Sequence, residues 1–290
     1  MVKESVLIIG LGEIGRPIFE MMKESKQFKV YGFDVDEAKM RRAGQSVRSL
    51  PEHVDVLHVC IPCTSKTDLA KTVTVYAKRF KPKLLIIHST VPPGTTSQVY
   101  ESFKGLVAHA PVFGTHRSLE YMKWEMSRWT KIVGGVNAES AEAASNHLQK
   151  AGIKTRIVKG PLETELTKLL ETIYTAWMIT FFQEAHRISR HFGAELEDIV
   201  SSIAEIHKMR LDRPVWFPDV IGGHCLIQNT ELLLDAYDSE HLRLILKSNE
   251  KRKREVQDKK VQKDIEKTRE IAGKLQTDLG KACHLATYNA

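Results

Sequence analysis

The sequence predicts an α/β fold, with a mostly parallel sheet in the first half and an all-helical region after it, and three observations carry that prediction. Over residues 1–160, short runs rich in Val, Ile and Leu alternate with segments of helical composition, as expected for βαβ units. Gly160 and Pro161 end this alternation, and no convincing strand follows them. The 290 residues are enough for two domains with separate cores. We therefore expect one domain at residues 1–160 and a helical one at 161–290.

The predicted strands of the first domain are apolar and bounded by Gly, Pro or Asp, which is typical of strands that helices cover on both faces. They lie at residues 5–9, 29–33, 54–60, 84–89, 105–109, 131–133 and 155–158. Helical segments between them complete the βαβ units.

The second domain is predicted to begin with one long helix over residues 162–192, because apolar residues recur there at helical spacing. We expect Trp177, Phe181 and Phe182 on its buried face. Further helices are expected at 195–208, at 229–238 and from 240 onward as one long final helix. The sparse apolar stripe of that helix predicts packing along one narrow face or against a second copy.

Composition and charge exclude several classes of protein. Charged residues make up 27% and hydrophobic residues 42%, which is ordinary for a globular chain, and no apolar stretch is long enough to cross a membrane. We expect a soluble, cytoplasmic protein. The net charge of +7 is concentrated between residues 247 and 274, which we interpret as a solvated helix of mixed charge, with RNA or membrane contact as the alternative. No nucleic-acid-binding motif accompanies it.

A glycine pattern follows the first predicted strand and opens a helix. Gly10, Gly12 and Gly15 are spaced Gly-x-Gly-x-x-Gly. In this context the first glycine permits a tight turn, the second lets the backbone approach a pyrophosphate, and the third permits close packing of helix on strand. The helix N-terminus then meets the phosphates. The pattern predicts a Rossmann domain that binds a dinucleotide.

Asp34 ends the next predicted strand, where a carboxylate can accept hydrogen bonds from both ribose hydroxyls and would repel a 2′-phosphate. The sequence therefore predicts NAD as the cofactor, and the nearby Arg41 and Arg42 leave NADP as an alternative. The residues predicted to bind the cofactor are Gly10, Leu11, Gly12, Glu13, Ile14, Gly15, Asp34, Val35, Ile61, Pro62 and Thr90.

Later segments resemble the UDP-glucose/GDP-mannose dehydrogenase family, which includes the UDP-N-acetylmannosamine dehydrogenases. The segments that carry the resemblance are Ile61-Pro62, Ser89-Thr90-Val91-Pro92-Pro93-Gly94-Thr95-Thr96, Glu165-Leu166-Thr167-Lys168-Leu169 and Gly222-Gly223-His224-Cys225. The family's enzymes continue into a further domain that holds much of the sugar nucleotide, and we expect this chain to lack it.

The resemblance implies a small-molecule substrate and a dimer formed through the helical domain. It also implies that Cys225 is a nucleophile, Lys168 its electrostatic partner and Thr90 a neighbour of the nicotinamide. A thiolate can hold an aldehyde as a thiohemiacetal between two hydride transfers, and a lysine can stabilise the oxyanion. The residues implied to bind substrate are Thr172, Gly222, Gly223, His224 and Asn229.

The sequence departs from the family at three positions where the family has Asn, Asp and Glu. They are occupied by Thr172, Asn229 and Val112. Without the two acids, hydrolysis of a thioester lacks its obvious proton relay. Two hypotheses follow: one reversible two-electron step on an alcohol or carbonyl group of a nucleotide-sugar-like or smaller substrate, or a noncatalytic, regulatory protein that keeps the cofactor site.

The cysteines and histidines offer weaker patterns. Cys60 and Cys63 have the spacing of a redox or metal pair, yet they end a predicted strand and have no second pair, so we expect a structural role. His109, His116 and His224 have no ligand spacing, and we predict no metal.

Overall fold

The computed structural model describes residues 3–63, 65–114, 117–210, 216–222 and 225–286. It divides into two compact units, residues 1–170 and residues 171–290. The division falls inside α7 (Pro161–Phe192), the long helix that begins where the strand pattern of the sequence ends.

A seven-stranded sheet forms the first unit, in the order β2-β1-β3-β4-β5-β6-β7. All neighbours are parallel except β5 and β6. The strands are β1 (Glu4–Ile9), β2 (Phe28–Phe33), β3 (Val56–Val59), β4 (Leu84–Ile87), β5 (Leu106–His109), β6 (Lys131–Gly135) and β7 (Thr155–Ile157). The chain leaves β1 for β2 on one side and returns to β3 on the other, so the strand order reverses beside β1, where α/β sheets bind ligands.

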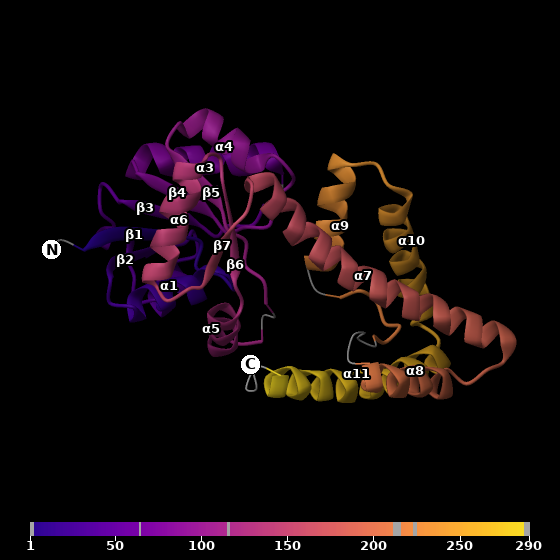
Figure 1. Ribbon diagram of the computed structural model, residues 1–290. Helices are drawn as coiled ribbons and strands as arrows, with labels where there is room; N and C mark the ends of the chain where they lie inside the picture. The colour runs from indigo at the N-terminus through magenta and orange to yellow at the C-terminus, as the bar shows by residue number, and fades with distance from the viewer. Residues whose placement is uncertain (1–2, 64, 115–116, 211–215, 223–224, 287–290) are drawn as a thin grey trace. The chain divides into compact units, whose positions relative to one another are not determined.

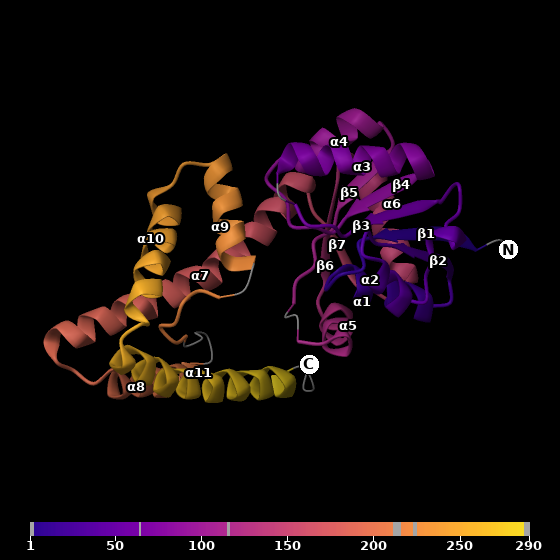
Figure 2. The same ribbon diagram turned by 180° about the vertical axis from the view of Figure 1, so that it is seen from behind.

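Helices cover both faces of this sheet (Figures 1 and 2). One face packs on α3 (Lys66–Phe80) and α4 (Thr95–Phe103), through a core that includes Leu57, Val73 and Val99. The other packs on α1 (Gly15–Glu24), α2 (Glu37–Arg42), α5 (Leu119–Arg128) and α6 (Ala138–Lys150). A short 3-10 helix, η1, spans Val47–Ser49.

The predicted fold class is confirmed, because a mostly parallel sheet with helices on both faces is followed by helices. Each predicted strand forms, and its ends move by at most two residues. Successive side chains of a strand enter opposite cores: Leu57 packs against α3, and Val56 packs against the other set of helices. These doubly buried strands explain the continuous apolar runs of the sequence.

In the described residues of the second unit, every regular element is a helix. The unit contains the rest of α7, followed by α8 (Leu196–Arg210), α9 (Cys225–Ala236), α10 (Glu240–Glu255) and α11 (Lys259–Ala286). The apolar stripe of α11 packs along α8, with Ala272 and Leu275 in a cluster that contains Val200 and Phe182. The sequence predicts that this stripe packs along one narrow face or against a second copy. In the structure it packs along α8.

Two predictions for this unit are wrong. The final helix is not continuous: α10 ends at Glu255, and Asp258 caps α11 by accepting a hydrogen bond from the Lys260 amide at 2.8 Å. Phe181 is exposed, while its neighbour Phe182 is buried, because adjacent residues of a helix point in directions about 100° apart. No helix in the described part of the chain is long and apolar enough to cross a membrane.

Candidate functional site

Two glycines of the loop after β1 are required by close contacts. Gly10 has a φ of +89°, and a Cβ there would lie 2.5 Å from the carbonyl oxygen of Cys60. A Cβ on Gly15 would lie 1.7 Å from the carbonyl oxygen of Gly10. These contacts press the loop against the end of β3 and set α1 close behind it, so only glycine fits at either position.

Gly12 differs, because a Cβ there would meet nothing within 4 Å. It borders a hollow of about 310 Å³ beside the N-terminal end of α1. Its lining is Gly12, Glu13, Arg16, Pro17, Arg117, Ser118, Leu119 and Met122, and Arg16 is paired with Glu20 at 2.6 Å. The free space beside a helix N-terminus suits an anionic ligand that approaches the backbone closely, as a dinucleotide pyrophosphate does.

Asp34 lies at the end of β2, beside the glycine loop. Its Oδ2 accepts a hydrogen bond from the Leu11 amide at 2.7 Å, and its Oδ1 accepts one from the Asp36 amide at 2.9 Å. Lys39 approaches Oδ2 to 3.8 Å. A carboxylate has about four acceptor positions, so these two amide hydrogen bonds leave capacity for ribose hydroxyls.

The other predicted cofactor residues lie on the loops that follow neighbouring strands. Ile61 and Pro62 follow β3, and the Ser89 hydroxyl after β4 donates to the carbonyl oxygen of Ile61 at 2.6 Å. Thr90 comes next and is half-buried, whereas Val35 is almost fully exposed. The structure therefore brings the loops after β1, β2, β3 and β4 to one edge of the sheet.

Glu165 fastens the loop that carries Thr90 to the start of α7. Its side chain is fully buried and accepts hydrogen bonds from the amides of Gly94 and Thr96, at 2.6 and 2.8 Å. The Thr96 hydroxyl donates to the same carboxylate at 2.6 Å. This carboxylate therefore caps the N-terminus of α4. Lys168, one turn further along α7, holds its Nζ 5.1 Å from the centre of the Phe113 ring.

Buried basic groups lie near this loop. His109 contacts the Thr164 hydroxyl at 2.7 Å and the carbonyl oxygen of Ser89 at 3.0 Å, and burial lowers its pKa to about 4. Burial also lowers the pKa of Lys131 to about 7, where its Nζ donates to the carbonyl oxygen of Pro111 at 2.9 Å. Both groups are therefore held in environments that disfavour positive charge.

A chain of three buried imidazoles, which sequence reasoning missed, crosses the face of the sheet that packs on α6. His147 contacts Glu4 at 2.8 Å and His58 at 2.9 Å, and His58 contacts His88 at 2.8 Å. The chain ends at the carbonyl oxygen of Ala110, 2.7 Å from His88. Four hydrogen bonds need four protons and three neutral imidazoles supply three, so the complete chain of hydrogen bonds requires one further proton.

The residues predicted to bind or react with substrate fall in different units. Thr90 and Lys168 belong to the first unit, while Cys225, Thr172, Gly222 and Asn229 belong to the second. Cys225 is half-buried and is the first residue of α9, which also carries the buried Asn229. Thr172 is buried on α7, and Gly222 is exposed. Gly223 and His224 lie outside the described residues, as does His116.

Cys60 and Cys63 are reduced thiols in the core of the first unit, and the Cys63 thiol donates to the carbonyl oxygen of Ser65 at 3.4 Å. Burial raises the pKa of Cys60 to about 12 and that of Cys63 to about 11, which disfavours the reactive thiolate at neutral pH. Over the described ranges, no group of three or more His, Cys, Asp or Glu side chains is arranged to bind a metal ion.

Comparison with protein-family models matches residues 162–251 to the central domain of the UDP-glucose/GDP-mannose dehydrogenase family. The UDP-N-acetyl-D-mannosamine dehydrogenase of Methanocaldococcus jannaschii is 25% identical over 95% of this chain and 70% of its own length. That of Methanococcus maripaludis is 25% identical over 77% of this chain and 59% of its own length. The chain thus spans between about three fifths and seven tenths of these relatives.

Solved structures share the fold. The UDP-D-ManNAc dehydrogenase of Pyrococcus horikoshii superposes with a TM-score of 0.70 at 22% identity, covering 85% of this chain and 68% of that one. A 3-hydroxyisobutyrate dehydrogenase of Mycobacterium tuberculosis gives a TM-score of 0.65 at 17% identity, covering 89% of this chain and 95% of that one. The second structure is matched over nearly its whole length.

Proposed function

Since the chain belongs to the UDP-glucose/GDP-mannose dehydrogenase family, we propose that it is an NAD-dependent oxidoreductase acting on an alcohol or carbonyl group. The observation that carries this proposal is the glycine loop. Gly10 and Gly15 lie too close to neighbouring backbone atoms to accept a side chain, whereas Gly12 faces free space in a hollow that two arginines border. Asp34 beside the loop favours NAD over NADP, because its carboxylate would repel a 2′-phosphate. Bound NAD supplies the hydride acceptor.

The substrate in this proposal is a nucleotide sugar or a smaller hydroxy compound. The relatives named above act on UDP-N-acetyl-D-mannosamine, which supports the first class. The fold of a 3-hydroxyisobutyrate dehydrogenase, matched over 95% of its length, supports the second. A panel of UDP-sugars, GDP-mannose and small hydroxy acids, read by NADH absorbance, distinguishes the two classes.

We assign the chemistry to Cys225, Lys168 and Thr90. With a nicotinamide cofactor bound, the substrate alcohol would lose a hydride to it and a proton to solvent, which leaves an aldehyde. The Cys225 thiolate would then add to the carbonyl carbon, and the carbonyl oxygen would become the oxyanion of a thiohemiacetal. The Lys168 ammonium stabilises that oxyanion, and Thr90 orients the nicotinamide. Val112 is buried among apolar side chains and offers no carboxylate for the later hydrolysis of a thioester. One reversible two-electron step is therefore the reaction we propose.

The competing proposal is a noncatalytic NAD-binding scaffold or regulatory protein. It is favoured by the same missing carboxylates, at Val112 and Asn229. Turnover of any member of the substrate panel overturns the scaffold, and tight NAD binding without turnover overturns the enzyme. Cys225→Ala provides the second test: an active enzyme that keeps its full rate in this variant does not use Cys225 as a nucleophile.

We also propose a homodimer formed through the helical unit. Tyr174, Phe181, Ile188 and Phe192 of α7 are each more than half exposed. The first three are seven residues apart, and the fourth follows one turn later, so they share one face of the helix. A second copy of this chain would bury such a stripe. Sedimentation measures the mass: a monomer at micromolar concentration contradicts the dimer.

A further inference from the structure

The segment that leads to Cys225 is held by side chains rather than by a regular element. In residues 216–222, the Asp219 amide donates to the carbonyl oxygen of Phe217 at 2.9 Å. The Val220 amide donates to the Asp219 side chain at 2.7 Å. Two other main-chain groups of this segment bond to buried amide side chains from two different helices.

The first of these side chains is Asn249 of α10, whose Oδ1 accepts a hydrogen bond from the Ile221 amide at 2.8 Å. The second is Gln183 of α7, whose Nε2 donates to the carbonyl oxygen of Asp219 at 2.8 Å. Asn249 is 1% exposed and Gln183 is fully buried. Because water cannot replace a partner lost at such positions, each hydrogen bond restricts the segment to one arrangement.

The orientation of Gln183 is itself fixed. The Ser248 hydroxyl donates to its Oε1 at 2.6 Å, so Nε2 is the atom that faces Asp219. Arg252 donates to the main-chain oxygen of Gln183 at 2.9 Å. Arg187 in turn donates to the main-chain oxygen of Ser248 at 3.2 Å, which ties α7 to α10 at this level.

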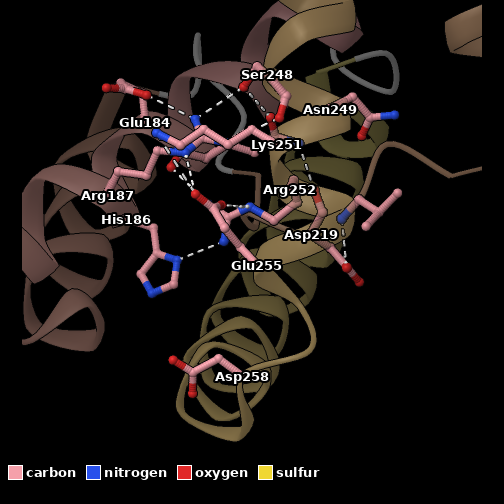
Figure 3. A network of polar contacts seen from close by, with 12 residues as sticks. Glu184, His186, Arg187, Asp219, Ser248, Asn249, Lys251, Arg252, Glu255 and Asp258 are labelled. Atoms are coloured by element: carbon pink, nitrogen blue, oxygen red, sulfur yellow. Dashed lines mark hydrogen bonds and ion pairs between the residues drawn. The ribbon is translucent and has the colours of Figure 1, made fainter.

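Arg252 lies at the centre of this network (Figure 3). Its side chain is fully buried, its Nη1 contacts Nδ1 of His186 at 2.9 Å, and its Nε lies 3.3 Å from Glu255. His186 reaches Asp264 of α11 through its other nitrogen, at 3.1 Å. Three helices are therefore linked through one buried guanidinium, and the network contacts the loop at Asp219 and Ile221.

We propose that Asn249 and Gln183 are positioning residues for Cys225. They hold Asp219 and Ile221, and Cys225 follows Ile221 by four residues, at the first position of α9. This inference rests on the proposed role of Cys225 as the reactive thiol. A nucleophile displaced by about 1 Å loses roughly a hundredfold in rate, so buried hydrogen bonds on its own loop affect the reaction without touching substrate.

The test compares Asn249→Leu with Asn249→Asp in the full-length chain. Leucine removes the acceptor for the Ile221 amide, whereas aspartate retains an oxygen there. Thr268→Val is the matched control, because Thr268 is also fully buried in this unit but donates only within α11. The readouts are hydrogen exchange of the peptide containing Ile221, alkylation of Cys225 resolved by mass spectrometry, and turnover.

We expect Asn249→Leu to speed exchange at Ile221 and alkylation of Cys225 by tenfold or more, and to lower kcat by at least tenfold with the KM for NAD unchanged. Asn249→Asp restores exchange and alkylation to within threefold of the natural chain. Equal alkylation rates in Asn249→Leu and Thr268→Val overturn the proposal. Where Asn249→Asp does not fold, Gln183→Met, which removes the donor to Asp219, must reproduce the effect of Asn249→Leu or the proposal is wrong.

Exchange and alkylation need no turnover, so they separate this inference from the proposed function. If Cys225→Ala keeps full activity, the covalent role fails, yet the two physical readouts still report whether Asn249 holds the loop. If those readouts do not respond to Asn249→Leu, the positioning role fails whatever Cys225 does.

Discussion

The Asp34 carboxylate accepts a hydrogen bond from the Leu11 amide at 2.7 Å, which ties the end of β2 to the glycine loop after β1. The side chain is buried, and its other oxygen accepts from the Asp36 amide. The residue that we assign to the cofactor ribose therefore also shapes the loop that we assign to the pyrophosphate. A substitution at Asp34 must be chosen so that these two roles can be separated.

Asp34→Asn, with urea unfolding measured beside NAD titration, makes that separation. Its amide oxygen still accepts from Leu11 while the negative charge that favours ribose hydroxyls is lost, but its amide group then faces the Asp36 N–H, and any strain this puts on the loop is measured as lost stability. Since a hydrogen bond to a charged group contributes about 1.5–3 kcal/mol, we expect NAD to bind about tenfold more weakly or worse, and NADP to lose less. Calorimetric titration measures both. Asp36→Asn, which alters only the exposed cap of α2, is the control, and an unchanged NAD affinity in Asp34→Asn removes the role of Asp34.

Gly12→Ala and Gly15→Ala form a matched pair within the glycine loop. A methyl group at Gly12 meets no protein atom, so that variant folds normally but obstructs a ligand that needs the free space. A methyl group at Gly15 collides with the carbonyl oxygen of Gly10, so that variant loses stability. Urea unfolding and NAD titration together distinguish them. Normal NAD binding by Gly12→Ala would show that no cofactor approaches the backbone there.

Glu165→Gln tests the cap of α4. The glutamine oxygen can replace only one carboxylate oxygen, and its amide group then faces a main-chain N–H. Because leaving a buried donor unsatisfied costs about 1–3 kcal/mol, we expect the free energy of unfolding to fall by roughly that amount. Glu163→Gln, nearer the start of the same helix, should change stability by less than about 1 kcal/mol. Equal effects of the two variants would contradict a special role for Glu165.

Acid should destabilise the first unit. Burial, reinforced by the neighbouring imidazoles or Lys131, holds the pKa values of His58 and His88 well below that of a free histidine, and burial lowers that of His109 to about 4. Between these values and the ordinary histidine pKa of 6.5, the unfolded chain binds more protons than the folded one, so stability is lost as the pH falls below about 6.5.

Burial of Lys131 also makes the folded chain less stable as the pH falls, but over a higher pH range. Its pKa falls from 10.5 to about 7, so the cost of folding with a buried neutral amine grows as the pH drops from about 10 to 7 and is constant below. Urea midpoints measured from pH 8 to pH 5 should therefore fall steadily. A midpoint at pH 5.5 equal to that at pH 7.5 would mean that these histidines remain paired when protonated.

The sheet could be predicted from the sequence because its strands are buried on both faces. Apolar runs bounded by Gly, Pro or Asp then mark each strand directly. The break between α10 and α11 was missed because no Gly or Pro marks it. The sequence feature that marks the break is Asp258, because aspartate favours the N-cap position and a helical stretch begins directly after it at Lys259.

Polar residues in the cores could not be predicted in the same way. His58, His88 and His147 come from distant parts of the chain, so only the strand order and the packing of α6 bring them together. The charged segment from residue 247 was interpreted as a solvated helix. Arg252 and Asn249 correct that interpretation, because both are buried. His186 and Gln183 of α7 supply partners for Arg252, and the Ile221 amide supplies the partner for Asn249.

Titration of the chain with NAD and with NADP by calorimetry decides whether it binds a nicotinamide dinucleotide. We expect saturable binding of one NAD per chain, with NADP bound at least tenfold more weakly because of the Asp34 carboxylate. Folded protein that gives no saturable heat with millimolar NAD would contradict the claim that this glycine loop holds a nicotinamide dinucleotide.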